Sequence, residues 1–382
     1  MNKRFNRIFF SVLIIWLAVA LFNAVKPHVE FSENENKYLS AFPEISAEKV
    51  YSGEFMQGFN TYANEQFVAR DAWIAAYSTF EYARLSREIN GVFVTSDALI
   101  SKIDPPVESY VDTNTGAINL LCDRLDARVY VMIVPSASEI TPQNLPAFAE
   151  TWDQSEELEK IKSKLDGATF VDVTKELKAH SDEYIFYRTD HHWTTYGASL
   201  ACDEFRKAAG LPEREYDLRE VSDSFNGTNY SKSGVRFVKS DVIEALPLPD
   251  GVVCTVYTGK DGKAHDGAYF EEYLGKKDKY AYFLGQNEGL VKLTGGKEGG
   301  RKLLMFKDSY AHCFAPLLLD EYSEITLADA RYLRLKLADV SDLSEYDDVL
   351  FLYSTDGFVS QDSLGKMAYF LSDATERNEE KK

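Results

Sequence analysis

The sequence predicts an α/β protein with a mostly parallel β-sheet flanked by helices and an N-terminal transmembrane helix. Short apolar runs alternate with amphipathic segments along most of the chain, which is typical of parallel strands covered on both faces. A basic tip followed by a long apolar run opens the chain, as in a single membrane-spanning helix. With 382 residues, 45% hydrophobic and 13% aromatic, the chain can bury a sizeable core.

The charge balance is strongly acidic and narrows the choice of partners. Forty-two Lys and Arg stand against 61 Asp and Glu, which gives a net charge of -19. Such a field repels phosphate backbones, so we expect no nucleic-acid binding. The four cysteines are far apart and form no CxxC pair. They exclude a zinc ribbon or a disulfide-dense scaffold and leave open one or two disulfides.

Residues 1–25 are predicted to be a cytoplasmic tip and a membrane anchor. The tip is basic, and the uncharged run Ile8–Val25 follows it. Because basic residues stay on the cytoplasmic side, the rest of the chain is expected to lie outside the cell membrane. A cleaved signal peptide is the alternative, with Ala18-Val19-Ala20 as its cleavage site, and the protein would then be secreted.

Three further regions follow the anchor. Residues 26–90 are predicted to form a polar stalk and then helices whose regularly spaced aromatics are core residues. Residues 91–375 form the main α/β domain, which opens with a hairpin turning at Ser96-Asp97. Residues 376–382 are a charged tail.

Apolar runs and helical periodicity place the elements of the main domain. We expect buried strands at Val129–Val134, Thr169–Val173, Ile185–Arg188, Lys302–Phe306 and Val349–Tyr353. We expect helices at Gly116–Ala127, Ser155–Leu165, Tyr196–Ala209 and Ala311–Tyr322, the third capped by Thr194 or Thr195 and closed by Gly210. Gly- and Asp-rich turns between short runs predict a β-rich insertion over about 216–300, with Val252–Tyr257 and Tyr280–Leu284 among its runs.

Three loops follow the predicted strands and carry polar side chains. They are Asp190 to Trp193, Asp308-Ser309 and Tyr353-Ser354. Catalytic groups in parallel α/β sheets gather at the carboxyl ends of strands, so we expect these loops to meet.

Ser309, His192 and Asp190 together supply the groups of a nucleophilic triad. A serine hydroxyl needs a base, and the base needs a carboxylate that fixes its tautomer. In an extended stretch residues i and i+2 project to the same side, so Asp190 can reach His192 while His191 points elsewhere. The Ser309 amide, near a helix start, and the Asn287 side chain are the oxyanion-donor candidates.

The remaining residues of these loops receive supporting roles. Asp308 is either an anchor or a helix cap, while His191 and Trp193 are expected to form a wall and to pack. Tyr353 and Ser354 are candidates by position alone. Structural alternatives stay open, because the histidine run can be a loop that packs its tryptophan, and the serine before Tyr310 can simply cap a helix.

A metal site is the other chemical interpretation of the histidine run. Asp190, His191 and His192, with Asp308 or His312, offer carboxylate and imidazole ligands that suit zinc or manganese. Neighbouring histidines diverge in an extended chain, so we predict no metal and no cofactor at the site.

The Asp190-His191-His192-Trp193 run, together with Asp308-Ser309-Tyr310 after a late strand, resembles the DHHW family of extracytoplasmic proteins. That family is similar to the alginate O-acetylation proteins, which are SGNH-hydrolase-like acetyltransferases. The likeness extends more loosely over Gln66–Asp71, Gly91-Val92, Val134-Pro135, Phe225–Thr228 and Phe283–Asn287. Lys307 departs from the pattern, because SGNH enzymes often have Gly before Asp-Ser.

The resemblance implies an SGNH-like fold in which Asp190 and His192 match an Asp-x-His pair and Ser309 matches the nucleophile. It implies an O-acetyltransferase or acetylesterase acting on a cell-surface or exported polysaccharide, with a membrane-bound O-acyltransferase supplying the acetyl group. A catalytically inactive glycan-binding or scaffold protein is the first alternative, since fold alone does not establish activity. A metal-dependent hydrolase is the second.

Overall fold

The computed structural model describes residues 3–32 and 37–367, so the predicted charged tail 376–382 lies outside the described residues. The chain divides into two compact units. The first comprises Met1–Ser86 with Ser231–Arg236, and the second comprises Arg87–Tyr230 with Phe237–Lys382.

The first unit begins with helix α1 (Lys3–Val25). Its segment Arg4–Val25 is long and apolar enough to cross a membrane, as expected, and none of that surface is buried within the protein. Strands β1 (Phe31–Ser32) and β2 (Lys37–Tyr38) pair, and helices α2 (Ala47–Ser52), α3 (Glu54–Glu65) and α4 (Arg70–Ala83) follow. Membrane topology and the domain boundaries stay predictions.

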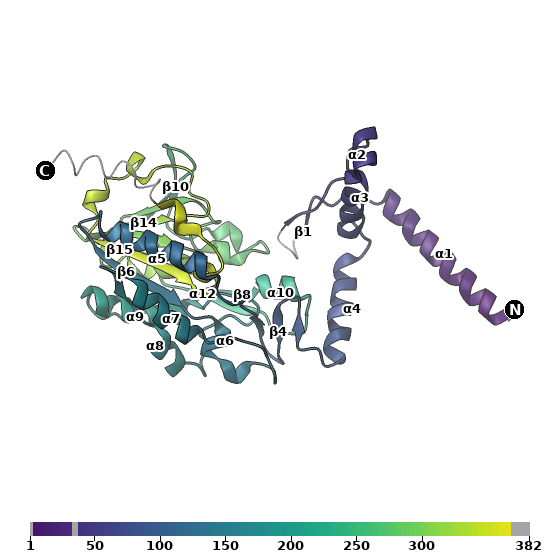
Figure 1. The fold of residues 1–382 in the computed structure, drawn as a ribbon, viewed down its shortest axis with the longest axis horizontal. Coiled ribbons are helices and arrows are strands. Elements are labelled where there is room, and N and C mark those ends of the chain that lie inside the picture. Colours follow the sequence, from purple (N-terminus) through teal and green to yellow (C-terminus); the bar gives the residue numbers. More distant parts are fainter. Residues whose placement is uncertain (1–2, 33–36, 368–382) are drawn as a thin grey trace. The chain divides into compact units, whose positions relative to one another are not determined.

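The second unit is built on one eight-stranded mixed sheet (Figure 1). Its strand order is β11-β10-β12-β14-β13-β15-β6-β7. The strands from β14 to β7 are parallel, and β12, β10 and β11 add antiparallel at one edge. Their bounds are β6 (Arg128–Val134), β7 (Thr169–Phe170), β10 (Val253–Tyr257), β11 (Gly262–Asp266), β12 (Leu290–Thr294), β13 (Arg301–Lys307), β14 (Tyr322–Ala328) and β15 (Asp348–Ser354).

Helices cover both faces of this sheet. Successive side chains along each strand point to opposite faces, so the sheet contributes to two separate hydrophobic cores. One core joins the sheet to α5 (Glu108–Cys122), α7 (Gln154–Lys164) and α12 (Thr355–Val359). The other joins it to α8 (Thr174–Ala179), α9 (Thr195–Ala209) and α11 (Ala311–Phe314). The predicted α/β class, a mostly parallel sheet flanked by helices, is therefore confirmed.

Smaller elements complete the second unit. A three-stranded sheet contains β3 (Glu88–Ile89), β4 (Val92–Val94) and β5 (Leu99–Ser101), so the hairpin expected at Ser96-Asp97 forms. Helices α6 (Ala137–Ile140) and α10 (Thr228–Ser233) are short, and the second extends into the residues of the first unit. The 3-10 helices span Pro142–Asn144, Glu271–Tyr273, Lys279–Tyr282, Ala315–Leu318, Leu337–Asp339, Leu343–Glu345 and Ser363–Lys366.

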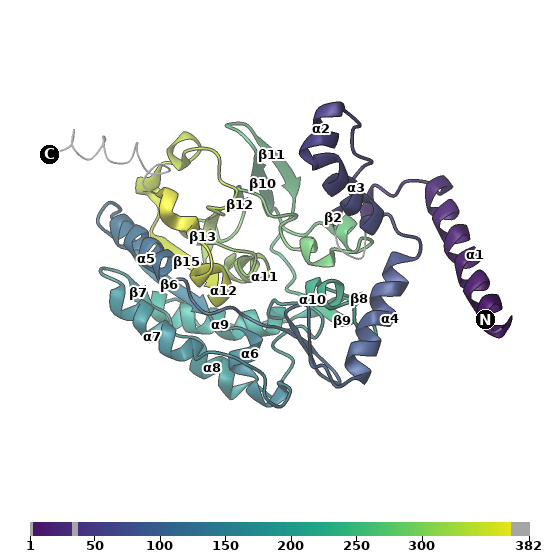
Figure 2. The ribbon, with the colours of Figure 1, turned by 45° about the vertical axis from the view of Figure 1, so that its right-hand side comes forward.

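The region expected to be a β insertion divides into two parts. Strands β8 (Arg219–Phe225) and β9 (Asp241–Ala245) form their own two-stranded sheet. Strands β10 and β11 form a hairpin that continues the main sheet beyond β12 (Figure 2). The run Tyr280–Leu284 is not a strand. It begins in the 3-10 helix Lys279–Tyr282, and Leu284 has a φ of 62°.

Two further local predictions were wrong. Ile185–Arg188 is not a strand of the sheet; it makes a single bridge, between Phe186 and Trp193. The helix expected up to Tyr322 ends earlier, at Leu318, and Tyr322 opens the parallel strand β14. Both segments are apolar and buried. An apolar run predicts burial, but it does not distinguish a strand from a packed loop or helix. All four cysteines are free thiols, so no disulfide forms.

Candidate active site

Ser309 lies directly after the central strand β13, in a tight turn that we call the serine loop (residues 308–310). Asp308 fixes this turn. One of its carboxylate oxygens accepts the Tyr310 amide at 2.9 Å, and the other accepts the amide and hydroxyl of Ser354 at 2.8 and 2.7 Å. Because Ser354 ends the neighbouring strand β15, the nucleophile candidate is held by the adjacent strand end.

Asp190 and His192 lie on a second segment, the histidine loop (residues 184–194), which is held by a residue that sequence reasoning missed. Asp241, fully buried at the start of β9, accepts four hydrogen bonds from this loop. The donors are the Tyr184 hydroxyl (2.5 Å), the Arg188 amide (2.7 Å), the Thr189 amide (2.8 Å) and the Thr189 hydroxyl (2.5 Å). Tertiary contacts thus replace the strand that the sequence predicted here.

Asp190 is oriented by the Phe225–Thr228 run. One carboxylate oxygen accepts the Thr228 amide at 2.7 Å, and Gly227 packs so closely that an added Cβ would stand 2.2 Å from the same oxygen. Burial would raise the pKa of Asp190, but His191, His192 and these hydrogen bonds outweigh it and hold the pKa well below its ordinary value. Asp190 is therefore a buried, charged carboxylate.

The histidine and serine loops bring the three predicted residues into hydrogen-bond contact. His192 Nδ1 lies 2.5 Å from Asp190 Oδ1, and His192 Nε2 lies 2.7 Å from Ser309 Oγ, although the two residues are 117 positions apart. An ionised Asp190 only accepts, so Nδ1 carries the hydrogen and Nε2 is free to accept the Ser309 proton. This is the connectivity that activates a serine hydroxyl.

Reciprocal hydrogen bonds tie the two loops together. The Trp193 indole donates to the Tyr310 carbonyl at 3.0 Å, and the Tyr310 hydroxyl donates to the His191 carbonyl at 2.5 Å. Trp193 is fully buried, as its packing role requires. Trp193 follows His192 in the chain and Tyr310 follows Ser309. The contact between them can be recognised only in the folded structure, where the two loops meet.

The other candidates are placed less centrally. The His191 ring is partly exposed and lies 3.9 Å from that of His192, so it covers one face of the base. Tyr353 is buried in the core against Phe358, and Ser354 acts on Asp308 as described above. Asn287 is exposed, and no contact in the described part of the chain joins it to Ser309.

Asp190, His191 and His192 also form the cluster that most resembles a metal site. One ligand atom from each lies within 4.8 Å of the others. The donors fit a cation poorly here, because Asp190 already accepts from the His192 ring and from the Thr228 amide, while His192 Nε2 faces the Ser309 hydroxyl. These atoms are therefore engaged in hydrogen bonds and are poorly disposed to hold a metal ion.

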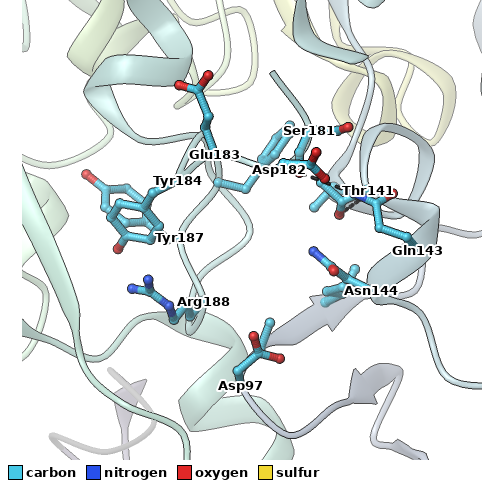
Figure 3. Close-up of a pocket in the computed structure, with 14 residues that line it drawn as sticks. Asp97, Thr141, Gln143, Asn144, Ser181, Asp182, Glu183, Tyr184, Tyr187 and Arg188 are labelled. Carbon is cyan, nitrogen blue, oxygen red and sulfur yellow. Dashed lines mark hydrogen bonds between the residues drawn. The ribbon is translucent and has the colours of Figure 1, made fainter. Parts of the chain in front are cut away.

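A pocket of about 380 Å³ borders the histidine loop. Asp97, Asn144 and Arg188 surround it from three separate segments (Figure 3). The Arg188 guanidinium lies 4.2 Å from the centre of the Tyr184 ring, which also lines the pocket. The walls thus combine amide, carboxylate, guanidinium and aromatic groups.

Comparisons with known proteins fit this geometry. The family described as the SGNH hydrolase-like domain of acetyltransferase AlgX matches residues 104–228, which include Asp190 and His192 but not Ser309. A crystal structure of a DHHW family protein from Eubacterium siraeum is 27% identical, covers 73% of this chain and 95% of its own, and superposes with a TM-score of 0.63. The chain is similar to the DHHW family proteins. The resemblance expected from the Asp-His-His-Trp run is confirmed.

More distant structures share the DHHW-like fold. Bacillus cereus PatB1 is 18% identical, with a TM-score of 0.59 over 71% of this chain and 98% of its own. PatB1 with a sulfonyl adduct is 16% identical, with a TM-score of 0.57 over 71% of this chain and 96% of its own. No curated protein sequence matches the chain. The matched domain family is one of SGNH-like acetyltransferases.

Proposed function

We propose that this protein is an extracytoplasmic O-acetyltransferase, or acetylesterase, that acts on a cell-surface or exported polysaccharide through an acetyl-serine at Ser309. The observation that carries the proposal is the continuous contact from Asp190 through His192 to the Ser309 hydroxyl. The SGNH-like acetyltransferase family match supports the acetyl group as cargo. The apolar helix α1 supports an anchored protein whose second unit lies outside the membrane.

The reaction has two halves. His192 Nε2 takes the Ser309 proton while Oγ attacks the acetyl carbonyl carbon, and the protonated imidazole then returns that proton to the leaving alcohol. A sugar hydroxyl, or water in an esterase, next gives its proton to His192 Nε2 while its oxygen attacks the acetyl carbon. The bond from that carbon to Ser309 Oγ then breaks, and the imidazolium returns the proton to Oγ, which restores Ser309. The Ser309 amide donates to no other described group, so it is the oxyanion donor that we assign.

The acceptor is proposed to be a neutral polysaccharide, with one sugar unit bound in the pocket beside the histidine loop. Asp97 and Asp182 line that pocket, and the net charge is -19, so an anionic chain would be repelled. Asn144 and Arg188 can donate to sugar hydroxyls there. Helix α1 would keep the site near the membrane, where a membrane-bound O-acyltransferase is the proposed acetyl donor.

Serine-directed labelling tests this proposal. A sulfonyl fluoride is expected to modify the full-length protein at Ser309, and 4-nitrophenyl acetate to be hydrolysed, with both lost in Ser309→Ala. Ser360→Ala, a serine outside the site, is the matched control and should behave as wild type. An unlabelled wild-type protein without esterase activity would favour the inactive scaffold. Activity that a chelator removes and zinc restores would favour the metal-dependent hydrolase.

A further inference from the structure

Tyr280 lies against the catalytic histidine, although nothing in the sequence marked it. It belongs to the 3-10 helix Lys279–Tyr282 between β11 and β12 and is buried. Its ring is stacked on that of His192, with centroids 4.0 Å apart and an angle of 12° between the planes. Its hydroxyl has two acceptors within reach, the Ser309 carbonyl oxygen at 3.1 Å and Cys313 Sγ at 3.5 Å. One side chain therefore touches both the proposed base and the backbone of the proposed nucleophile.

The stacking has an electrostatic consequence during the reaction. His192 becomes an imidazolium when it takes the Ser309 proton, and the face of an aromatic ring attracts a cation, more strongly where water is excluded. Asp190 acts at the edge of the imidazole, through Nδ1. Tyr280 acts on its face. The two interactions are directed differently, so neither replaces the other.

A second buried histidine, His312, also lies near Tyr280. The two rings are nearly parallel, with centroids 6.2 Å apart, and His312 Nε2 lies 2.7 Å from Lys307 Nζ. Burial, and then the Lys307 charge, hold the pKa of His312 well below its ordinary value. His312 is thus neutral and places no second cation on the ring. Among the described aromatic rings, those of His191 and Tyr310 also lie near His192, with centroids 3.9 and 5.3 Å away.

We infer that Tyr280 is a positioning residue of the reaction, which holds His192 and Ser309 in register and stabilises the imidazolium through its ring face. The inference rests on the proposed serine mechanism. Lys307, which departs from the Gly that SGNH enzymes often have before Asp-Ser, contacts His312 through its amine, and the amine lies 3.6 Å from Asp329.

Ring-preserving and ring-removing variants test this role. Tyr280→Phe keeps the stack, and its kcat for 4-nitrophenyl acetate should stay within about threefold of wild type. Tyr280→Leu and Tyr280→Met remove the aromatic face and should lower kcat about 3- to 30-fold, the range of a cation–π contact, with KM unchanged. Two replacements are used because one of them can fail to fold.

Tyr282→Leu is the matched control. Tyr282 is equally buried, but it stacks on Tyr269 at 4.8 Å. This variant should lose thermal stability yet keep its kcat. The inference is overturned if the folded ring-less variant keeps wild-type kcat, if Tyr280→Phe falls as far as the ring-less variants, or if Tyr282→Leu lowers kcat equally. A wild-type protein without Ser309 labelling would instead overturn the proposed function itself.

Discussion

The serine loop and the histidine loop reach the same point by different means. Each is fixed by a buried carboxylate, Asp308 in one and Asp241 in the other. Asp308 binds the end of an adjacent parallel strand, whereas Asp241 binds backbone and hydroxyl donors from 52 or more residues earlier in the chain. The nucleophile candidate therefore follows from the sheet itself, and the base candidate depends on a separate tertiary clamp.

The largest expected effect comes from Asp190→Asn, which breaks the histidine side of the contact. An amide no longer fixes the tautomer of His192 or stabilises its imidazolium, so kcat for 4-nitrophenyl acetate should fall by about 10⁴-fold. Backbone geometry is expected to survive, which circular dichroism and thermal unfolding would show. A variant that keeps more than a tenth of wild-type kcat would contradict a catalytic role for Asp190.

Gly227→Ala tests whether the histidine loop depends on the Phe225–Thr228 run. The new Cβ would meet the Asp190 carboxylate at 2.2 Å, so Asp190 must move, and about a hundredfold loss of kcat is expected. Gly116→Ala is the control, because nothing lies within 4 Å of its added Cβ and its helix position favours alanine. Equal kcat of the two variants would show that activity does not depend on the position of Asp190 against Gly227.

Asp241→Asn and Asp308→Asn compare the two anchors directly. The Asp241 carboxylate accepts from the Arg188 and Thr189 amides, and an asparagine NH₂ group would face donors. We expect Asp241→Asn to lower the free energy of unfolding by about 2–3 kcal/mol and kcat about tenfold. Asp308→Asn should lower the free energy of unfolding by less, because the Asp308 carboxylate accepts fewer hydrogen bonds than that of Asp241. Urea unfolding and esterase assays of both proteins measure the difference, and a reversed order would contradict the comparison.

The smallest effect concerns pH. The pKa of Asp190 is lowered in the folded protein, so the unfolded chain takes up the proton first as pH falls. The stability that the charged carboxylate contributes is thus present above about pH 4 and lost below it. The midpoint of thermal unfolding should drop more steeply between pH 5 and 3 in the wild type than in Asp190→Asn, by about 2 °C. Parallel curves would indicate that Asp190 is not charged in the folded state.

The sequence allowed strands β13 and β15 and the serine loop to be predicted, because both strands are continuous apolar runs that end at polar residues. It also paired Asp190 with His192 through their i, i+2 spacing. It did not allow β12 or β14 to be predicted. Asp241, Tyr280 and the Trp193–Tyr310 contact could not be predicted. Each depends on segments brought together only by folding, and each uses a residue type that is common in any core or turn.

The order of the strands has a consequence for how the protein is made. Strand β15, the last strand along the described part of the chain, lies between β13 and β6, near the middle of the sheet. Until residue 354 has emerged, β6 with β7 and β13 with β14 are two fragments with unpaired edges, and Asp308 lacks its Ser354 partner. The turn that carries Ser309 can therefore gain its contact with Ser354 only after strand β15 has been made.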